Sequence, residues 1–341
     1  MQLTRAAFPK ISLVGHPSDG YGGGTLALTV KNFAAMVTAK PGRRMEIGVR
    51  LGASHNGPQS LVNFTRRYGY PDATRLMLAA LVRLMAWCEA RGIGIEDKAC
   101  ALSLRTTIPR QVGMGGSSAI VRATLDALCG FYAIAIPLRD RVTLALEAET
   151  VELGIEAGLV DRVVQVFDGA IHFQCEDATG WSATRVDTRL LPKLFVAYRS
   201  DLAKISSGGV LSPIGARFRA GDREIVAIMA ELRELAKGAA ADLRAGRIAP
   251  FLARIDRGMD LRVKLMPQLD SRYFELADIG RTLRAHVTFT GSGGAVVGTF
   301  ENRSHFIALK KAYGEVGATM IAVTPSQPRP DDNYGSSGAL P

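Results

Sequence analysis

The chain of 341 residues is long enough for two domains, each with a large hydrophobic core. Its 42 lysines and arginines outnumber its 32 aspartates and glutamates, which favours small phosphorylated or carboxylated partners. The basic residues are scattered and aromatic residues make up only 7 % of the chain, so we expect no nucleic-acid partner.

Membrane and secretion signals are not expected in this chain. No apolar run reaches the length of about 18 residues typical of a membrane span, and Met1 to Lys10 lacks the apolar core of a signal peptide. We therefore expect a cytoplasmic protein. The four cysteines lie among apolar residues without C-x-x-C spacing, which favours free thiols over disulfides or zinc.

The first 192 residues are predicted to form both strands and helices. Alternation of apolar and polar residues favours the strands, and apolar residues at helical spacing favour the helices. The predicted elements are strands over 7–14, 25–39, 45–51 and 101–107, a turn-rich loop over 16–24, helices over 72–91, 119–132 and 138–153, and a helical turn from 163 that leads into a strand over 170–173.

A change of pattern near residue 193 predicts a domain boundary, with one domain over 1–192 and a second over 193–324. Beyond residue 324 the composition turns to proline, serine, glycine and aspartate, which predicts a disordered tail over 325–341. The elements predicted for the second domain are strands over 194–198, 287–290, 295–300 and 318–323 and helices over 222–245, 248–265, 271–285 and 304–314.

The segment Ile108 to Val121 reads IPRQVGMGGSSAIV and joins a predicted strand to a predicted helix. Glycine allows backbone to approach a ligand closely, and the first turn of a helix presents free N–H groups and a positive dipole end. The segment therefore predicts a polyphosphate site. It lacks the lysine of a P-loop and the third glycine of a dinucleotide fingerprint. A glycine turn with Ser117 as helix N-cap is the alternative.

A second glycine cluster, TGSGGA at 290–295, lies between two predicted strands and on its own also suits a tight hairpin. The helix over 138–153 ends in three glutamates, of which one could bind a metal or act as a base, although a solvated acidic face is the alternative. Asp161 and Asp168 interrupt an apolar run, where an unpaired carboxylate is costly to bury.

Four of these features together resemble the GHMP kinases. Residues 109–119 are similar to the family's second motif, P-x-x-x-G-L-G-S-S-A, with one residue more, and residues 290–294 are similar to its third. The first motif is matched by three residues: Lys10, Gly15 and Asp19. The spacing of Glu149, Gly154, Gly158 and Asp161 is similar to that between the family's metal-binding glutamate and its catalytic aspartate.

Within the family the chain is most similar to the glucuronokinases, over nearly its whole length except the tail. Three departures stand out: Thr288 occupies a position where a lysine is usual, Lys10 replaces an arginine common in sugar kinases, and residues 200–204 follow the family only loosely. The segments that carry the likeness are 15–21, 108–113, 116–121, 157–163 and 289–297.

The resemblance implies the GHMP kinase fold of mixed α/β and α+β class, with an N-terminal α/β ATP-binding domain, a C-terminal ferredoxin-like domain and the active site in the cleft between them. It also implies an ATP-dependent sugar 1-kinase with Mg²⁺ as cofactor. The reaction implied is phosphorylation of the anomeric hydroxyl of a uronic acid, D-glucuronate, to give glucuronate 1-phosphate.

The resemblance also assigns roles to individual residues. Asp161 is the expected catalytic base, Lys10 is expected to keep it ionised, and Ser118 and Glu149 are the expected Mg²⁺ ligands. The residues expected to bind the ATP phosphates are Pro109, Gly113, Gly115, Gly116, Ser117, Ser118 and Ala119. Those expected to bind the sugar are Asp19, Tyr21, Gly291, Ser292 and Gly293.

Two alternatives stay open at this point. One is a kinase for another sugar, such as galactose, galacturonate or a heptose phosphate, and the other is a non-catalytic regulator that binds a sugar or nucleotide. A uronic acid needs a cation for its carboxylate, and an arginine suits it best. The candidates among which the sequence does not choose are Arg50, Arg66, Arg162 and Arg199.

Overall fold

The computed structural model describes residues 2–47, 56–72, 74–96, 98–175, 180–202, 207–267, 269 and 271–327. Two compact units share these residues, each assembled from separate stretches of chain. The first unit comprises Met1–Pro9, Phe33–Ile108 and Gly116–Val166, and the second unit comprises Lys10–Asn32, Pro109–Gly115 and Phe167–Pro341. The domain boundary expected between residues 192 and 193 stays a prediction.

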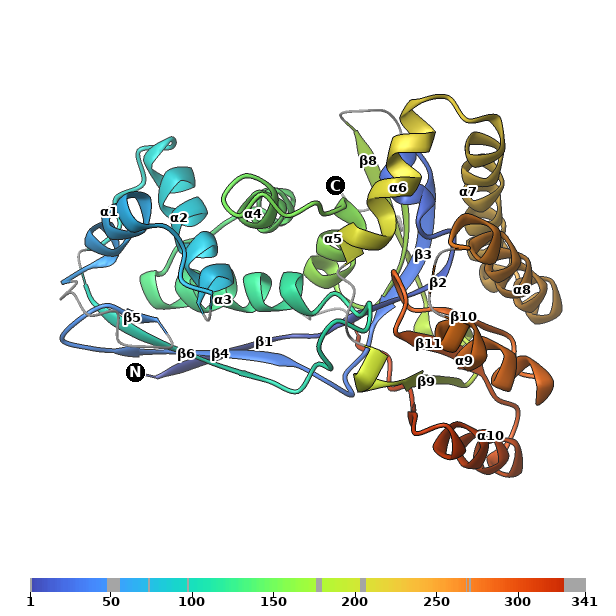
Figure 1. Ribbon diagram of the computed structural model, residues 1–341. Helices are drawn as coiled ribbons and strands as arrows, with labels where there is room; N and C mark the ends of the chain where they lie inside the picture. The colour runs from blue at the N-terminus through green and yellow to red at the C-terminus, as the bar shows by residue number, and fades with distance from the viewer. Residues whose placement is uncertain are drawn as a thin grey trace. The chain divides into compact units, whose positions relative to one another are not determined.

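In the first unit, four strands form a mixed sheet in the order β1-β4-β6-β5 (Figure 1). Strand β5 runs parallel to β6, and the other neighbours are antiparallel. The strands are Leu3–Ala7 (β1), Ala35–Pro41 (β4), Glu46–Ile47 (β5) and Cys100–Thr106 (β6). The helices are Pro58–Tyr68 (α1), Arg75–Glu89 (α2), Gly116–Tyr132 (α3), Leu138–Thr150 (α4) and Leu159–Phe167 (α5), whose last residue belongs to the second unit.

Helix α3 is the central helix of the first unit. It packs against strands β1 and β4 and against helices α2 and α4, and Figure 1 shows α2, α3 and α4 on one face of the sheet. Its residues from Ser118 to Cys129 are almost all buried, which explains why this helix is apolar on most of its circumference. The glycine- and serine-rich start of α3 is therefore anchored by a well-packed core.

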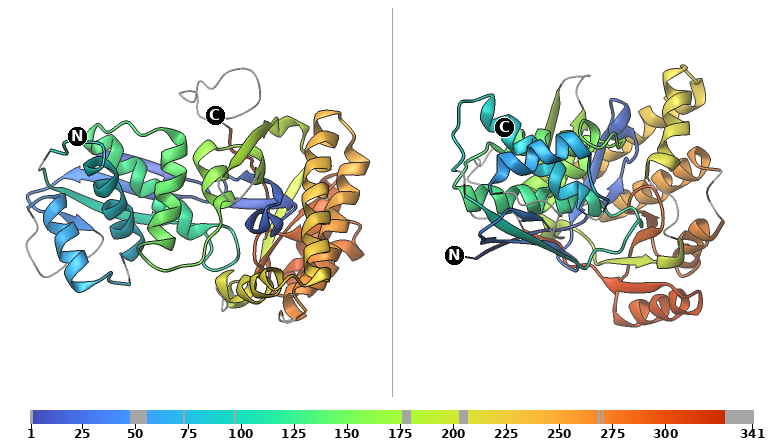
Figure 2. Two further views of the ribbon diagram at one scale, coloured as in Figure 1. Left: turned by 90° about the horizontal axis from the view of Figure 1, so that it is seen from above. Right: turned by 60° about the vertical axis from the view of Figure 1, so that its left-hand side comes forward.

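The second unit contains two antiparallel sheets, in the orders β2-β3-β7-β8 and β10-β11-β9-β12. Figure 1 labels most of their strands, and Figure 2 shows the same ribbon from two further sides. The strands of the first are Lys10–Val14 (β2), Gly24–Thr29 (β3), Ala170–Cys175 (β7) and Trp181–Val186 (β8). Those of the second are Leu194–Tyr198 (β9), Val287–Phe289 (β10), Ala295–Thr299 (β11) and Thr319–Ala322 (β12). The helices are Ser207–Arg219 (α6), Arg223–Arg244 (α7), Ile248–Leu265 (α8), Ser271–Thr282 (α9) and Arg303–Glu315 (α10).

The sheet with β9 at its centre has the topology expected of a ferredoxin-like domain. Strand β9 is followed by helices, then by the β10–β11 hairpin, helix α10 and β12, which gives a β-α-β-β-α-β order. Its neighbours β11 and β12 both run antiparallel to β9. Phe195, Leu232, Met259 and Phe289 are buried in the core between this sheet and its helices.

Two predicted strands are wrong in extent. The predicted strand over 25–39 is two strands, β3 and β4, because the chain turns between them. There the Asn32 side chain donates to the Ala322 carbonyl (2.9 Å) and accepts from the Thr324 N–H (2.7 Å). The predicted strand over 7–14 is likewise divided between β1 and β2. Alternation of apolar residues continues across both breaks, so it does not reveal them.

Three elements were not predicted from the sequence: α1, α6 and β8. Helix α6 contains Gly208, Gly209 and Pro213, residues that normally argue against a helix. Helix α5 begins at Leu159, before the predicted start at 163, and therefore includes Asp161. The other predicted helices and strands are confirmed with small shifts at their ends.

Ordered chain continues past the predicted start of the tail. Pro325 forms an antiparallel bridge with Val30, and the buried Ser326 hydroxyl contacts the Thr29 hydroxyl. The rest of the predicted tail, 328–341, lies outside the described residues, as does the end of the strand predicted over 45–51. Within the described ranges, no helix combines the length and apolar character needed to cross a bilayer. None of the four cysteines forms a disulfide, as predicted.

Candidate functional site

The two glycine clusters of the sequence meet within the second unit. Gln111, Gly113 and Gly115 have positive φ angles of 55°, 74° and 64°, so the 109–115 loop follows a path that favours glycine. A Cβ atom at Gly113 would lie 2.8 Å from the Gly293 carbonyl oxygen and 3.1 Å from the Ser292 nitrogen. The absence of side chains therefore allows backbone to pack directly on backbone.

Thr290 fixes the contact between the two loops. Its hydroxyl lies 3.3 Å from the carbonyl oxygens of both Val112 and Gly113, and its N–H donates to the Ala295 carbonyl at 3.1 Å. Strand β2 joins them, because the Ser12 N–H donates to the Thr290 carbonyl at 2.8 Å. The 290–295 segment is thus the turn of the β10–β11 hairpin, as its sequence suggested, and it is buried against the 109–115 loop.

Lys10, the charged residue of the first motif, lies on β2 beside the 109–115 loop. Its N–H donates to the Met114 carbonyl at 3.0 Å, and its Nζ donates to the Ser12 hydroxyl at 2.9 Å. The side chain is 2 % exposed. Burial of an ammonium group is costly unless polar groups compensate for it. The charge of Lys10 contributes to lowering the pKa of Asp19 and of His16.

Asp19 is held in a short one-turn helix, Ser18–Tyr21, by two donors. Its Oδ1 lies 3.1 Å from His16 Nδ1 and accepts from the Thr25 hydroxyl at 2.8 Å. Burial alone would raise the pKa of Asp19, but His16, Lys10 and the Thr25 bond together lower it to about 2. The carboxylate is therefore ionised. Tyr21, also predicted to bind the sugar, packs its ring on Phe218 at a centroid distance of 4.9 Å.

His16 was not selected from the sequence. Burial lowers its pKa, against the influence of the Asp19 carboxylate, and its Nε2 is a buried polar atom without a hydrogen-bond partner among the described residues. The Asp19 contact favours the tautomer with the proton on Nδ1, so Nε2 then presents a lone pair.

Arg262 is the second residue that sequence reasoning missed. It lies on α8, is 2 % exposed, and donates from Nη1 to the Phe289 carbonyl at 2.6 Å and from Nη2 to the Gly291 carbonyl. A signal was present: with Phe251, Ile255 and Met259 it occupies the apolar face of the helix, where an arginine is unusual.

In the first unit, the predicted phosphate-binding residues Gly116 to Ala119 form the first turn of α3. Ser118 and Ala119 are buried, whereas Ser117 is exposed. The helix has 17 residues and provides N–H groups and a partial positive charge at this end. Pro109, Gly113 and Gly115 belong to the loop of the second unit that runs directly into this helix.

Glu149 and Asp161, the predicted metal ligand and base, both approach one guanidinium in the first unit. Arg162 Nη2 donates to Oε2 of Glu149, and Arg162 Nη1 donates to the Gly158 carbonyl at 2.9 Å. The same Nη1 lies 3.9 Å from Oδ2 of Asp161, whose side chain is 27 % exposed. Burial lowers the pKa of Arg162 to about 10.

The other two glutamates of α4 and its end have structural partners. Arg83 pairs with Glu147 and, at 3.4 Å, with Glu152, which also accepts from the Tyr70 hydroxyl. Glu149 thus differs from its two neighbours in burial: it is 1 % exposed, and they are more exposed. The sequence did not distinguish them.

Two of the arginines considered for a substrate carboxylate already form ion pairs. Arg199 pairs with Asp201 at 2.8 Å and with Glu275 at 3.6 Å, and Arg162 pairs with Glu149. Arg66 is exposed on α1. Arg50 lies outside the described residues.

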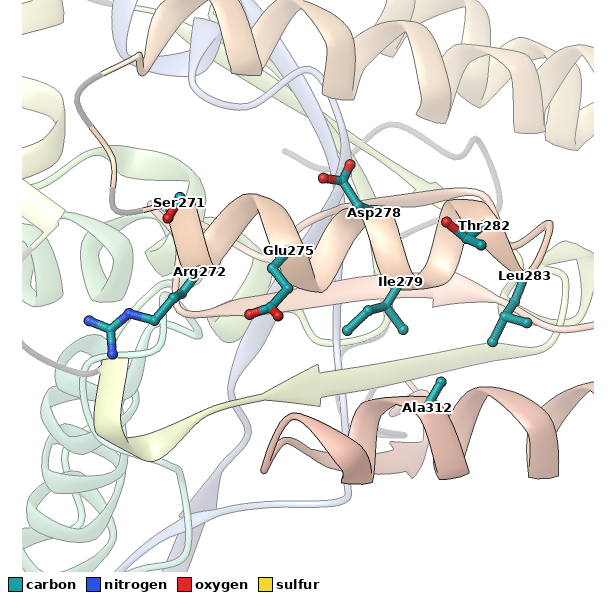
Figure 3. Close-up of a pocket in the computed structure, with 8 residues that line it drawn as sticks. All are labelled: Ser271, Arg272, Glu275, Asp278, Ile279, Thr282, Leu283 and Ala312. Atoms are coloured by element: carbon teal, nitrogen blue, oxygen red, sulfur yellow. The ribbon is translucent and has the colours of Figure 1, made fainter.

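A cavity of about 650 Å³ in the second unit lies elsewhere, between α9 and α10 (Figure 3). Its residues are Ser271, Arg272, Glu275, Asp278, Ile279, Thr282, Leu283 and Ala312. None of them belongs to the predicted site. Figure 3 shows Ile279, Leu283 and Ala312 in the space between the two helices.

Similarity to known proteins agrees with these motifs. Residues 76–169 match the GHMP kinase N-terminal domain. The chain is 36 % identical over 306 residues to "Probable glucuronokinase 2" of Arabidopsis thaliana, covering 85 % of this chain and 82 % of the relative. It is 34 % identical over 309 residues to "Glucuronokinase 1" of the same plant, covering 86 % and 84 %.

The predicted GHMP kinase fold is confirmed by a solved structure. The mevalonate kinase of Methanococcus jannaschii superposes with a TM-score of 0.74 at 17 % identity, covering 96 % of this chain and 98 % of that one. At this identity the likeness concerns the fold alone, while the plant relatives carry the relationship in sequence. The chain therefore belongs to the GHMP kinase family and is a sugar kinase, a phosphotransferase that acts on an alcohol group.

Proposed function

We propose that this sugar kinase transfers the γ-phosphoryl group of ATP to the anomeric hydroxyl of D-glucuronate and so forms glucuronate 1-phosphate. The observation that carries the proposal is the similarity to two glucuronokinases over most of the chain. The buried cations Lys10 and Arg262 near the sugar-binding motifs support an anionic substrate.

The phosphates of ATP are proposed to bind at the start of α3 and along the loop before it. The first-turn N–H groups and the dipole of α3 favour negative charge there. Gly113 and Gly115 have positive φ angles that favour glycine, and this backbone path leads the loop into the helix start. Ser117, exposed at the helix start, supplies a hydroxyl for a phosphate oxygen.

Mg²⁺ is proposed to bind Ser118 and Glu149. The two side chains offer a hydroxyl and a carboxylate oxygen, the hard donors that Mg²⁺ prefers together with phosphate oxygens. Both are buried in the first unit, and one oxygen of Glu149 accepts from Arg162, so the donor set is compatible with the ion. When bound, Mg²⁺ would neutralise phosphate charge.

Asp161 is proposed to accept the proton of the anomeric hydroxyl. Its side chain is partly exposed at the start of α5, so a ligand can reach it. Lys10 is proposed to favour the ionised form of Asp161. That pairing stays a prediction.

The sugar is proposed to bind beside Asp19 and the 291–293 turn. The Asp19 carboxylate contacts His16 and accepts from Thr25 in the structure, so part of its hydrogen-bonding capacity holds the 16–25 loop in place. The remaining capacity is proposed to bind sugar hydroxyls, with Tyr21 and backbone groups of Gly291, Ser292 and Gly293 around the ring.

The proposal is tested by measuring ADP release with MgATP and a panel of sugars. D-Glucuronate is expected to give the highest kcat/KM, and the product is expected to carry phosphate on C1, as phosphorus NMR would show. The panel includes galacturonate, galactose, glucose and a heptose phosphate. If the enzyme prefers one of these sugars to glucuronate, that sugar is the substrate instead. Absence of turnover with every sugar would overturn the proposed activity.

A further inference from the structure

Arg262 joins helix α8 to the turn that carries the predicted sugar-binding glycines. Its two terminal nitrogens donate to successive parts of that turn, the Phe289 and Gly291 carbonyls, and Nη1 also lies 3.5 Å from the Thr288 hydroxyl. The guanidinium carbon lies 5.3 Å from the centre of the Phe289 ring. One side chain thus orients the backbone on both sides of Thr290.

The turn depends on this orientation, because it is built on backbone contacts. Thr290 reaches the 109–115 loop through its hydroxyl, and Gly113 packs against the backbone of Ser292 and Gly293. A planar guanidinium holds two carbonyls at a fixed spacing, which an ammonium group does not reproduce.

Arg262 also places an unneutralised charge beside the sugar-binding motifs. Among the residues that the structure describes, no carboxylate lies within 4.0 Å of its guanidinium, and its partners are neutral carbonyl and hydroxyl oxygens. Asp19 is the acid that interacts with it at longer range, and Lys10 and His16 lie in the same electrostatic environment.

We propose that Arg262 is a positioning residue that fixes the 290–293 turn and, through its buried charge, makes the sugar site select an acid over its neutral analogue. This inference rests on the proposed function, since it names the residue behind the preference for a uronic acid. Arg262 is too buried to touch the sugar itself in this structure, and it acts through the turn and through its field.

The test compares D-glucuronate with D-glucuronamide, in which a neutral amide replaces the carboxylate. Affinities for both are measured by calorimetry, and KM and kcat by ADP release, in wild type, Arg262→Gln and Arg262→Lys. Arg257→Gln is the matched control, since Arg257 lies on the same helix and pairs with Glu231 on an exposed surface.

Arg262→Gln is expected to lower the preference for acid over amide by about tenfold, with KM for ATP changed by less than about threefold. Arg262→Lys keeps the charge and is expected to retain most of the preference, with lower affinity for both sugars because the turn is less well held. The control is expected to match wild type in every measurement.

An unchanged acid-to-amide ratio in a folded Arg262→Gln, or an equal loss for both sugars, would overturn the inference. If the glutamine variant does not fold, Arg262→Lys decides: a preference as low as about one-tenth of wild type overturns it, since charge is retained there. A wild type that prefers the acid in calorimetry but does not phosphorylate it refutes the proposed function and leaves this inference standing.

Discussion

The Arg162 guanidinium donates a hydrogen bond to the Glu149 carboxylate, and both side chains are almost completely buried. The two opposite charges stabilise each other, because either one alone would be a buried charge without water or a counter-ion. The residue expected to bind Mg²⁺ is therefore also one half of a buried ion pair. The proposed Mg²⁺ site would therefore couple metal binding to the folding of the first unit at this carboxylate.

Glu149→Gln is expected to affect stability and metal dependence together. Loss of the Glu149 charge leaves the buried Arg162 charge without a counter-ion. This is expected to lower the free energy of unfolding by about 3–5 kcal/mol, which urea denaturation would measure. Loss of a carboxylate ligand is also expected to raise the Mg²⁺ concentration for half-maximal activity.

Glu147→Gln provides the control for that experiment. Glu147 pairs with Arg83 in a partly exposed position, where such pairs contribute about 0–1 kcal/mol. Its Mg²⁺ titration is expected to match wild type. If Glu149→Gln also leaves the Mg²⁺ titration unmoved, another acid holds the metal.

Asp161→Asn is expected to keep the fold and to lower kcat by about 10²–10⁴-fold, because asparagine cannot accept the hydroxyl proton. Single-turnover kinetics with glucuronate would measure the change, with circular dichroism as the check on folding. Asp168→Asn is the control, since Asp168 has a φ of 54° that asparagine tolerates. Turnover near wild type in a folded Asp161→Asn would remove this residue from the chemistry.

Gly113→Ala tests the contact between the two glycine loops. The new methyl group would lie 2.8 Å from the Gly293 carbonyl oxygen, at a residue whose φ of 74° already disfavours a side chain. The loops must separate, so we expect kcat/KM to fall by about 10²-fold or more, in line with the cost of misplaced groups in an active site.

Gly314→Ala is the matched control for the glycine variant. Gly314 lies in helix α10, where a Cβ meets nothing within 4 Å. This variant is expected to gain about 0.5–1 kcal/mol of stability with unchanged kinetics. Equal activity of the Gly113 and Gly314 variants would show that the loop contact is not needed for catalysis.

Local patterns predicted much of this arrangement. The glycine segment before α3 and the 290–295 turn are each one uninterrupted stretch of sequence. Their composition and spacing were therefore enough to select them as candidate binding loops. The pairing of Arg162 with Glu149 was not predicted, because it joins α4 to α5 through side-chain rotamers that periodicity does not determine. Arg262 stood out only as an arginine on the apolar face of α8, and its partners could not be predicted because they are backbone carbonyls 27 and 29 residues away.

The acid sensitivity of the second unit is expected to depend on His172. Burial, with help from the charges of Arg244 and Lys237, lowers the pKa of this histidine on β7 to about 4. Between pH values of about 6.5 and 4 the unfolded chain takes up a proton that the folded chain excludes, so stability falls as the pH falls through that window.

His172→Gln is expected to remove this part of the pH dependence. Wild type is expected to lose at most about 2 kcal/mol from this group between a pH of about 7.5 and about 5, while the variant loses less. Urea denaturation of both proteins at the two pH values measures the difference. Curves that fall in parallel would mean that His172 is protonated equally in the folded and unfolded chain, contrary to its burial against two positive charges.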